Sequence, residues 1–285
     1  MNQHIIGFCL FLALACLPAS LYGQWTDWYE DFDSYTNGQS LQGVNGWKGW
    51  DNTSANAALV SNAYASNGSN SVAISPTGAL GTGPSDLVHE YSTPGTGLFI
   101  YSADTYVPFD SIGTGVQYFI LLNVYNDGAE APKNWALQQL LSTDESLAYV
   151  VDLGIQADLL YDEWVTIRVE IDLDNNTQSL WYGDTELFTA QTWASGGAVE
   201  IGAVDLWNNN AGVMYYDNMS LVYDQGQTTG LLTINRETGA MTLKNDTDQP
   251  MNMALLSIRS DAGAFEPANW TSIAGNYDSA GNGTV

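Results

Sequence analysis

A single carboxylate lies inside an apolar, strand-like run late in the sequence. In residues 213–223, Asp217 shares its alternation phase with five residues that favour burial, namely Val213, Tyr215, Met219, Leu221 and Tyr223. A buried carboxylate stays charged only beside a cation or a full set of hydrogen-bond donors. The alternative is a β-bulge that shifts the phase, so that Asp217 points to water or caps a neighbouring turn.

A second acidic and aromatic run, residues 28–35, lies near the other end of the same segment. Its sequence is Trp-Tyr-Glu-Asp-Phe-Asp-Ser-Tyr, which offers several carboxylates. A cation shared between this run and Asp217 would satisfy the buried acid. The two runs therefore predict a closed β-sandwich that is pinned by a metal where its first and last strands meet.

Aromatic residues with polar neighbours suggest sugar binding, because pyranose C–H faces pack on Trp and Tyr rings while amides and carboxylates bond the hydroxyl groups. Trp50 and Trp135 are the preferred exposed platforms, since glycine or polar residues flank them. Core packing is the alternative for any single ring, because strands favour aromatic residues. The candidate ligand-binding residues are Trp50, Asp51, Trp135, Gln138 and Tyr182.

His89 is the only histidine after residue 23. As a base beside Glu90 or a tyrosine it would fit a polysaccharide lyase, whereas as an ordinary strand residue it packs against neighbours or lies at the surface. One histidine without a cysteine cannot supply the usual zinc ligand sets. No Gly-x-Ser-x-Gly motif is present, so a serine hydrolase is not supported.

Residues 1–23 are typical of a secretory signal peptide, with a short polar start, an apolar core over residues 5–17 and a small-residue tail. A membrane anchor would need about 20 continuous apolar residues. Both cysteines, Cys9 and Cys16, lie in this segment, so the mature chain has no thiol chemistry. We expect a protein that is secreted or held at the cell surface, without membrane insertion after signal removal.

The chain is strongly acidic, with a formal net charge of −26 and six Lys and Arg residues in total. Such a surface repels phosphate backbones and anionic lipids, which argues against nucleic-acid or membrane-surface binding. The charge suits divalent cations, neutral glycans or a salty medium. The alternative is that acidity only keeps a secreted protein soluble.

Turn residues interrupt the chain at short intervals, and no amphipathic helix is indicated after residue 23. The clearest strand is residues 164–173, where apolar and polar residues alternate. Residues 116–125 are apolar in both phases, which is typical of a central strand covered on both faces. Further strands are expected at residues 58–61, 71–75, 87–91, 98–107, 135–141, 148–153, 178–182 and 199–207. The pattern predicts an all-β, antiparallel sandwich.

The sequence also predicts a division of the chain. Residues 225–230 are polar and glycine-containing, as in a linker between a domain over residues 24–224 and a module over residues 231–285. Strands expected at residues 231–235, 240–244 and 251–259 are too few to close a sandwich. We therefore expect this β module to be incomplete, and the chain to be part of a longer one with further domains.

Three stretches carry a resemblance to a known family. The first stretch is Glu30-Asp-Phe-Asp-Ser-Tyr35 with Gly46-Trp-Lys-Gly-Trp50. The second is residues 164–181, and the third is residues 203–207 with 215–221. Together they are similar to concanavalin A-like, laminin-G-like domains of secreted modular bacterial proteins. The resemblance spans residues 28–223 and implies a jelly-roll β-sandwich. It says little about the ligand.

In many carbohydrate-binding jelly rolls an acid near the first strand and an Asp in the last strand share a structural calcium ion. Carried over by position, the resemblance implies Asp31 or Asp33 together with Asp217. Calcium takes six to eight oxygen ligands and mixes carboxylates with carbonyls, so the residue types are suitable. The expected cofactor is therefore a structural Ca²⁺.

A second resemblance concerns catalysis. Residues 169–175 are similar to the Glu-x-Asp-x-(x)-Glu strand of laminarinase-type glucanases, which would make Glu170 and Asp172 catalytic. The last member here is Asp174 or Asn175 instead of Glu, and an acid entering a turn is poorly placed to protonate a leaving group. The alternative is a solvated strand face that leads into an Asp-Asn-Asn turn.

Three functions remain open at this point. The first is a secreted, non-catalytic jelly-roll module that binds a glycan or serves in cell-surface adhesion or display. The second is a glycoside hydrolase or polysaccharide lyase of the same architecture that uses Glu170 and Asp172, or His89. The third is a purely structural spacer, which would bind no glycan.

Overall fold

The computed structural model describes residues 25–111, 114–151, 153–224, 230–234 and 241–245. Contacts divide the chain into two compact units, Met1–Gly226 and Gln227–Val285. In the second unit, β16 (Gly230–Ile234) and β17 (Met241–Asn245) form an antiparallel pair. The predicted signal peptide and the predicted strand at residues 251–259 lie outside the described residues.

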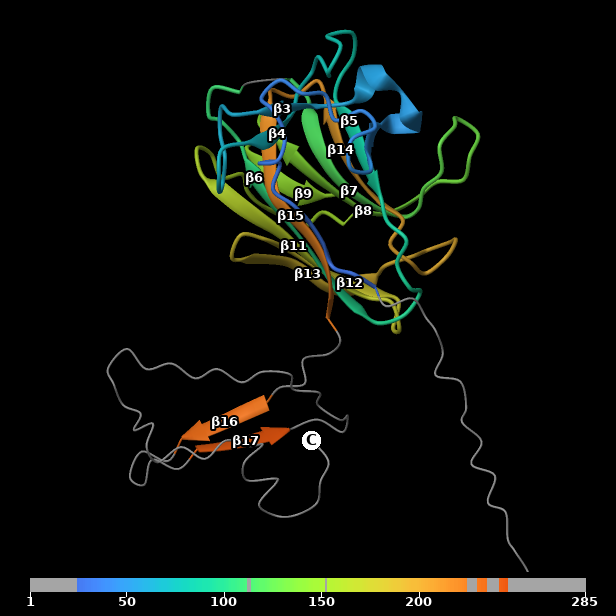
Figure 1. The fold of residues 1–285 in the computed structure, drawn as a ribbon, viewed down its shortest axis with the longest axis vertical. Helices are drawn as coiled ribbons and strands as arrows, with labels where there is room; N and C mark the ends of the chain where they lie inside the picture. The colour runs from blue at the N-terminus through green and yellow to red at the C-terminus, as the bar shows by residue number, and fades with distance from the viewer. Residues whose placement is uncertain (1–24, 112–113, 152, 225–229, 235–240, 246–285) are drawn as a thin grey trace, which may run out of the picture. The chain divides into compact units, whose positions relative to one another are not determined.

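The first unit contains two antiparallel sheets that form a sandwich (Figure 1). The eight-stranded sheet has the order β13-β12-β11-β6-β15-β4-β3, and β1 also pairs with β15. Its strands are β1 (Trp28–Glu30), β3 (Leu59–Ser61), β4 (Ser71–Ile74), β6 (Leu98–Tyr106), β11 (Trp164–Asp172), β12 (Thr177–Tyr182), β13 (Thr185–Thr192) and β15 (Met214–Asp224). The predicted adjacency of the first and last strands is confirmed by the pairing of β1 with β15.

The seven-stranded sheet has the order β10-β9-β8-β7-β14-β5-β2. Its strands are β2 (Trp47–Gly49), β5 (Asp86–Glu90), β7 (Val116–Val124), β8 (Asn134–Ser142), β9 (Leu147–Val150), β10 (Gln156–Asp158) and β14 (Ala203–Asn209). Only two single-turn 3₁₀ helices, η1 (Trp50–Asn52) and η2 (Ser54–Asn56), interrupt the strands of the described unit. The predicted all-β, antiparallel sandwich is confirmed. No helix among the described residues is long and apolar enough to cross a membrane.

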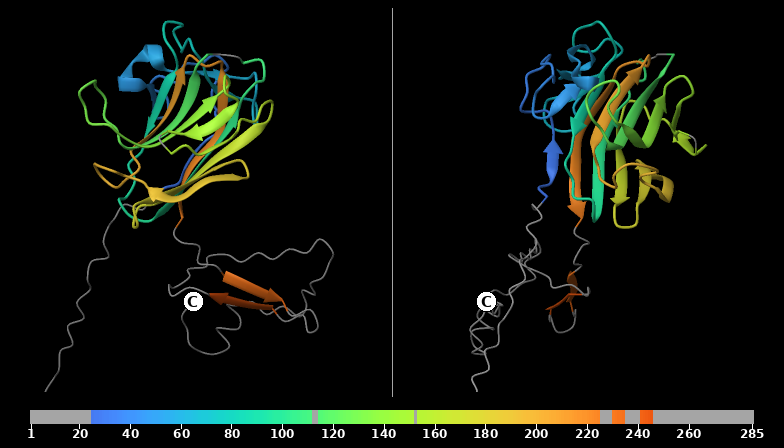
Figure 2. Two further views of the ribbon diagram at one scale, coloured as in Figure 1. Left: turned by 180° about the vertical axis from the view of Figure 1, so that it is seen from behind. Right: turned by 90° about the vertical axis from the view of Figure 1, so that its right-hand side faces the viewer.

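Alternating side chains explain how the two layers pack (Figure 2). On β11, Val165, Ile167 and Val169 are buried between the sheets while the intervening residues face outward. On β7, Phe119 and Leu121 join the same core. Each fully buried side chain of this size contributes roughly 1.5–3 kcal/mol to the free energy of unfolding.

The opposite face of β7 is also covered, as the apolar pattern predicted. A second apolar cluster lies outside the main core and contains Val88, Ile120, Leu122, Tyr125 and Ala203, with Trp50 and Tyr118 packed against it. We call this side of the seven-stranded sheet, facing away from the sandwich core, the outer face. Trp50 and Tyr118 therefore cover part of the second apolar face of β7.

A β-bulge corrects the predicted phase of the last strand. The register between β15 and β6 shifts between Asp217 and Ser220, and Asn218 has a φ of 46°. Tyr216 is therefore buried before the bulge and Met219 after it. The single alternation expected across residues 213–223 is wrong, because Tyr215 lies in the half-buried outward phase. Asp217 is nevertheless fully buried.

Candidate functional site

The outer face carries a cavity of about 290 Å³ over the centre of the seven-stranded sheet. Strands β5, β14, β7 and β8 form its floor, and the turn that holds Trp50 contributes to its wall. Its lining combines three tryptophans with two acids and one amide: Trp50, Asp86, Ile120, Trp135, Gln138, Asp205 and Trp207.

Strand register brings these residues together. Asp205 on β14 pairs with Ile120 on β7, which pairs with Gln138 on β8. On the next row Trp207 pairs with Asp86 of β5. Side chains of cross-strand partners lie on one face, and a diagonal neighbour two residues away is still within reach of a long side chain. Asp86 and Asp205 are such diagonal neighbours.

Asp205, which is buried, and Asp86, which is partly buried, are neighbouring carboxyl groups that we call the acid pair. Asp205 is 2% exposed. Among the described residues, no hydrogen-bond partner reaches Oδ1 of either acid. Burial raises the pKa of Asp86 to about 6. Burial, together with the neighbouring Asp86, raises the pKa of Asp205 well above its ordinary value.

Aromatic rings surround the acid pair in two stacked couples. The rings of Trp50 and Trp135 lie 6.1 Å apart at an interplanar angle of 22°. Those of Tyr118 and Trp207 lie 4.8 Å apart at 25°. Trp135 is 44% exposed, so one of the largest side chains of the outer face meets solvent instead of the core. Such a ring offers an apolar surface to a ligand.

The turn beneath Trp50 is fixed by polar contacts to its neighbours. Lys133 forms an ion pair with Asp51 at 2.8 Å and lies 5.1 Å from the centre of the Trp50 ring. The carboxylate of Asp51 accepts a hydrogen bond from the backbone N–H of Gly128, and its own N–H donates to the hydroxyl of Tyr125. These contacts hold Trp50 in place before any ligand binds.

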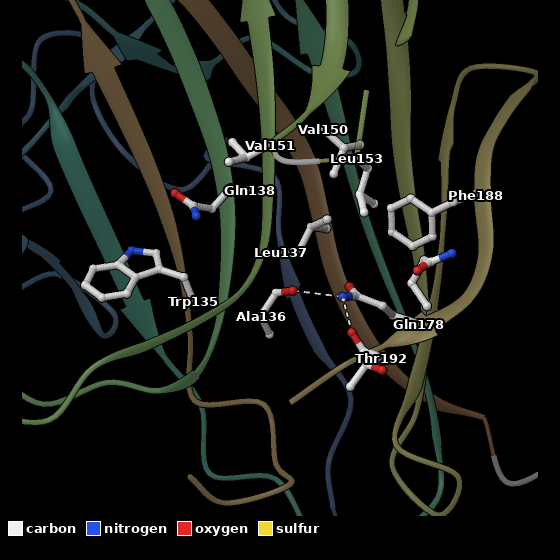
Figure 3. Close-up of a pocket in the computed structure, with 11 residues that line it drawn as sticks. Trp135, Ala136, Leu137, Gln138, Val150, Val151, Leu153, Gln178, Phe188 and Thr192 are labelled. Carbon is white, nitrogen blue, oxygen red and sulfur yellow. Dashed lines mark hydrogen bonds between the residues drawn. The ribbon is translucent and has the colours of Figure 1, made fainter. Parts of the chain in front are cut away.

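A second cavity of about 300 Å³ adjoins the first (Figure 3). It lies where β8 and β9 of one sheet approach β12 and β13 of the other, and Trp135 and Gln138 line both cavities. At its floor the side-chain amide of Gln178 donates to the carbonyl oxygens of Ala136, at 2.8 Å, and Thr192, at 3.0 Å (Figure 3). Because Trp135 and Gln138 line both, the two cavities are adjacent.

The structure brings four of the five predicted ligand-binding residues together. Trp50, Trp135 and Gln138 line the first cavity, and Asp51 anchors its wall. Tyr182 is elsewhere: it is buried in the main core, and its hydroxyl accepts a hydrogen bond from the N–H of Leu160. A ring enclosed in the core has no face to offer a ligand, so the expectation for Tyr182 is corrected.

The acid pair was missed at the sequence level, although one signal was present. Asp205 interrupts the apolar run of residues 203–207, just as Asp217 interrupts residues 213–223. Asp86 gives no such signal, because it begins a short strand after a turn. Their proximity depends on the register between β5 and β14, which no local pattern specifies.

The acids predicted to share calcium instead hold one loop. Oδ2 of Asp217 accepts from the N–H groups of Ser66, at 2.7 Å, and Asn67, at 3.3 Å. Oδ1 of Asp33 accepts from Ser69, at 2.7 Å, and Asn70, at 3.0 Å. The alternative interpretation of Asp217, as a turn cap beside a bulge, describes this arrangement.

These contacts bear on the predicted calcium site. Asp31 accepts from the N–H of Asp33. Asp33 and Asp217 face amide hydrogens, whereas calcium requires six to eight oxygen ligands. The described residues contain no cluster of three or more His, Cys, Asp or Glu side chains that could hold a metal. Asp31, Asp33 and Asp217 thus do not fit a shared ion as they stand, and metal removal tests the calcium ion that the resemblance implied.

Glu30, on β1, is a buried acid with a complete set of donors. Its carboxylate accepts hydrogen bonds from four groups: the N–H of Phe32 at 3.1 Å, the hydroxyl of Tyr35 at 2.8 Å, the amide of Asn45 at 3.1 Å and the indole of Trp47 at 3.2 Å. We call this arrangement the Glu30 hub. It ties β1 to the turn that precedes β2, and it raises the pKa of Tyr35, through burial and the neighbouring carboxylate, to about 12.

His89 packs within the aromatic core and does not line either cavity. Its ring lies 4.7 Å from that of Trp28 and 5.1 Å from that of Trp47, and its Nε2 is 3.2 Å from the carbonyl oxygen of Asn45. Burial lowers its pKa to about 4. The neutral ring therefore donates from Nε2 to Asn45, which is a packing role.

Glu170 and Asp172 lie on the outward side of β11, in the other sheet from the two lined cavities. Glu170 forms an ion pair with Arg168. Asp172 accepts from the backbone and side-chain amides of Asn175, and these hydrogen bonds, the side-chain one first, lower its pKa. The two acids thus serve a strand surface and a turn, as the solvated-face alternative describes.

Comparisons of the chain with known proteins do not identify a family. No protein-family profile and no curated protein sequence matches the chain. Solved structures that resemble it include a sialidase, at 8% identity and a TM-score of 0.44 over 70% of this chain and 18% of that one. Another is the catalytic domain of a glycoside hydrolase family 131 protein from Coprinopsis cinerea, at 14% identity and a TM-score of 0.44 over 70% of this chain and 94% of that one.

The cellulose-induced protein Cip1 is a further match, at 14% identity and a TM-score of 0.42 over 68% of this chain and 96% of that one. The chain thus spans about a fifth of the sialidase but nearly all of the other two structures. Likenesses at this level of identity and TM-score identify neither a family nor an activity.

Proposed function

We propose that this chain is a secreted, non-catalytic module that binds a glycan on the outer face of its seven-stranded sheet. One observation carries the proposal: Trp50, Trp135 and Trp207 enclose a cavity whose remaining polar lining consists of Asp86, Asp205 and Gln138. Sugar rings present apolar C–H faces beside hydroxyl groups. This lining matches both features, because indole rings pack on the C–H faces while carboxyl and amide groups bond the hydroxyls.

The size and continuity of the site favour a chain of sugars over a single one. Each cavity is close to the lower end of the range for small-ligand pockets, which begins at about 300 Å³. Trp135 and Gln138 belong to both cavities. A glycan could therefore lie across the exposed ring of Trp135 with units on either side of it.

The wider context of the module remains part of the proposal. Secretion or cell-surface display rests on residues 1–23, which lie outside the described residues. The net charge of −26 supports a glycan partner over a nucleic acid, because like charges repel.

Affinity electrophoresis in gels containing soluble polysaccharides tests the binding function. We expect at least one polysaccharide to retard the protein, and Trp135→Ala to weaken that retention by about tenfold, since stacking on an exposed ring is worth about 1.4 kcal/mol. Phe109→Ala is the matched control, because Phe109 is an exposed aromatic outside both cavities. Equal retention of all three proteins, or none on a broad panel, would favour a purely structural spacer.

An enzymatic function is the second candidate, and the acid pair is the observation that favours it. Two neighbouring carboxyl groups with raised pKa values resemble the sites in which one acid gives a proton while the other receives one. Release of shortened sugars from a retained polysaccharide, lost in Asp86→Asn, would establish this function. Binding without release supports the non-catalytic module.

A further inference from the structure

The acid pair has an unmet electrostatic requirement. Oδ1 of Asp86 and Oδ1 of Asp205 are buried without a hydrogen-bond partner among the described residues. The three basic side chains of residues 25–224 are already engaged elsewhere: Lys48 with Glu90 and Asp127, Lys133 with Asp51, and Arg168 with Glu170. No basic side chain of residues 25–224 is therefore free to neutralise the pair, and a cation from outside this unit would do so.

The lining of the cavity limits what can supply that charge. Hard divalent cations keep a shell of six or more oxygens, including waters and carbonyls. Apart from the acid pair and Gln138, the lining is aromatic or aliphatic, with Trp50, Ile120 and Trp135 among its members. Such walls are poor metal ligands, but the faces of tryptophan rings attract organic cations.

We infer that this cavity receives a protonated amine. Resting on the proposed function, we infer further that the bound glycan carries an amino sugar with a free amino group. An ammonium group has three donors, so a single one in the cavity can bond the carboxyl groups of both Asp86 and Asp205, which line it. The sugar that bears it would pack its C–H face on the neighbouring indole rings.

An N-acetylated or neutral sugar meets the requirement less well. Its amide or hydroxyl group donates hydrogen bonds but brings no charge, so two adjacent carboxylates keep their mutual repulsion or retain a proton. A free amine removes the repulsion and releases that proton. The overall charge of −26 also draws cationic ligands to the protein from solution.

This reasoning sets the pH dependence of binding. Protons and the ammonium group compete for the acid pair, so affinity for the amine should rise as the pH increases through about 6, where Asp86 titrates, and fall again once the amine loses its own proton. The other titratable groups that act on the pair are Asp51, beside Asp86, and Tyr216, beside Asp205. Asp51 forms an ion pair with Lys133, and burial raises the pKa of the Tyr216 hydroxyl, which stays protonated in this range.

Isothermal titration calorimetry with three tetrasaccharides of equal length and linkage tests the inference. The ligands are a fully deacetylated glucosamine oligomer, its fully N-acetylated form and the corresponding glucose oligomer, all at physiological ionic strength. We expect the wild-type protein to bind the deacetylated form about tenfold more tightly than the other two, as one charge-assisted contact predicts.

Two variants separate the acid pair from general attraction. Asp205→Asn should remove the preference for the amine, so that the deacetylated oligomer and the glucose oligomer bind the variant with similar affinity. Glu186→Gln makes the same change in net charge at an exposed position on β13 and should keep the preference. Thermal melting verifies folding, and Asp86→Asn, on the edge of the buried pair, repeats the test at a less enclosed position.

The possible results distinguish the inference from the proposed function. Equal affinity for the three oligomers, or a preference that survives both Asp→Asn changes, overturns the inference and leaves glycan binding in place. Absence of binding to all three, and to the polysaccharide panel, overturns both. Cleavage of the neutral oligomer that depends on the acid pair overturns the amine assignment in favour of the enzymatic function.

Discussion

Glu30 and Asp205 are both buried acids in one sandwich, yet their surroundings are opposite. Glu30 accepts four hydrogen bonds, two from residues within five positions of it and two from Asn45 and Trp47. Asp205 has an Oδ1 that no described donor reaches, and its near neighbour is another acid. A buried polar group normally has partners in the folded protein. We therefore assign Glu30, which has its donors, a structural role, and we interpret Asp205, whose Oδ1 lacks a donor, as a ligand-binding residue.

The two acids also differ in how they affect the free energy of unfolding. Removing the Glu30 carboxylate would leave four donors without an acceptor, whereas removing the Asp205 charge would leave none. Buried donors that lose their acceptor lower the free energy of unfolding. Removing one of two neighbouring like charges does not lower it. Mutations at the two sites should consequently change the free energy of unfolding in opposite directions.

Glu30→Ala is expected to have the largest effect on stability. We predict a loss of about 3 kcal/mol in the free energy of unfolding, because buried donors from Tyr35, Asn45 and Trp47 lose their shared acceptor. Urea denaturation followed by tryptophan fluorescence measures this loss. Tyr29→Ala, at an exposed neighbouring position, is the control and should change little. A loss at Glu30 no greater than at Tyr29 would contradict the structural role of the hub.

Asp205→Asn is expected to act in the other direction, by a smaller amount. At pH 8, above the pKa of about 6 of Asp86, the ionised Asp86 faces a second acid, so replacing that acid by a neutral amide should stabilise the variant by about 1 kcal/mol. At pH 4, where the wild-type pair is protonated, the difference should disappear. Denaturation at the two pH values measures both quantities, and a variant that is less stable at pH 8 would show that the pair is satisfied after all.

The sign of this pH dependence follows from the raised pKa of Asp86. Its folded pKa of about 6 exceeds the unfolded value of about 4, so its contribution is fully present below pH 4 and is lost as the pH rises through 6. Asp217, whose pKa burial also raises to about 6, acts with the same sign. His89, with its pKa lowered to about 4, acts oppositely and destabilises the fold as the pH falls from 6.5 to 4.

Metal removal is expected to have the smallest effect. Because N–H groups already occupy Asp33 and Asp217, we predict that EDTA leaves the melting temperature unchanged. Asp33→Ala should lower stability by about 1 kcal/mol with or without EDTA, since it frees two amide donors. A fall in melting temperature on EDTA addition that Asp33→Ala abolishes would instead support the predicted calcium.

The sequence predicted the strands whose apolar and polar residues follow a regular pattern. β11 and β7 follow from residues 164–173 and 116–125, because their patterns need no knowledge of distant partners. The phase of β15 did not follow, since one extra residue at the bulge reverses every side chain before it. Asn218 was the one available signal, as Asn tolerates positive φ better than most residues.

The candidate site shows the same limit. Composition and flanking residues were enough to select Trp50, Trp135 and Gln138. The acid pair could not be predicted, because Asp86 and Asp205 belong to strands far apart in sequence and meet only through the register of β5 with β14. Local patterns identify residues suited to binding, and long-range pairing decides which of them share a cavity.

The pairing of β1 with β15 has a practical consequence for engineering. Trp28 lies opposite Leu221, and the N–H of Tyr223 donates to Asp27 at 2.9 Å, so the two ends of the sandwich are neighbours. A short glycine-serine bridge between these ends should allow circular permutation, with new termini opened at the exposed residues 174–175 of a turn. The same proximity would let the sandwich be inserted into a host protein's surface loop while the host's own chain stays nearly continuous.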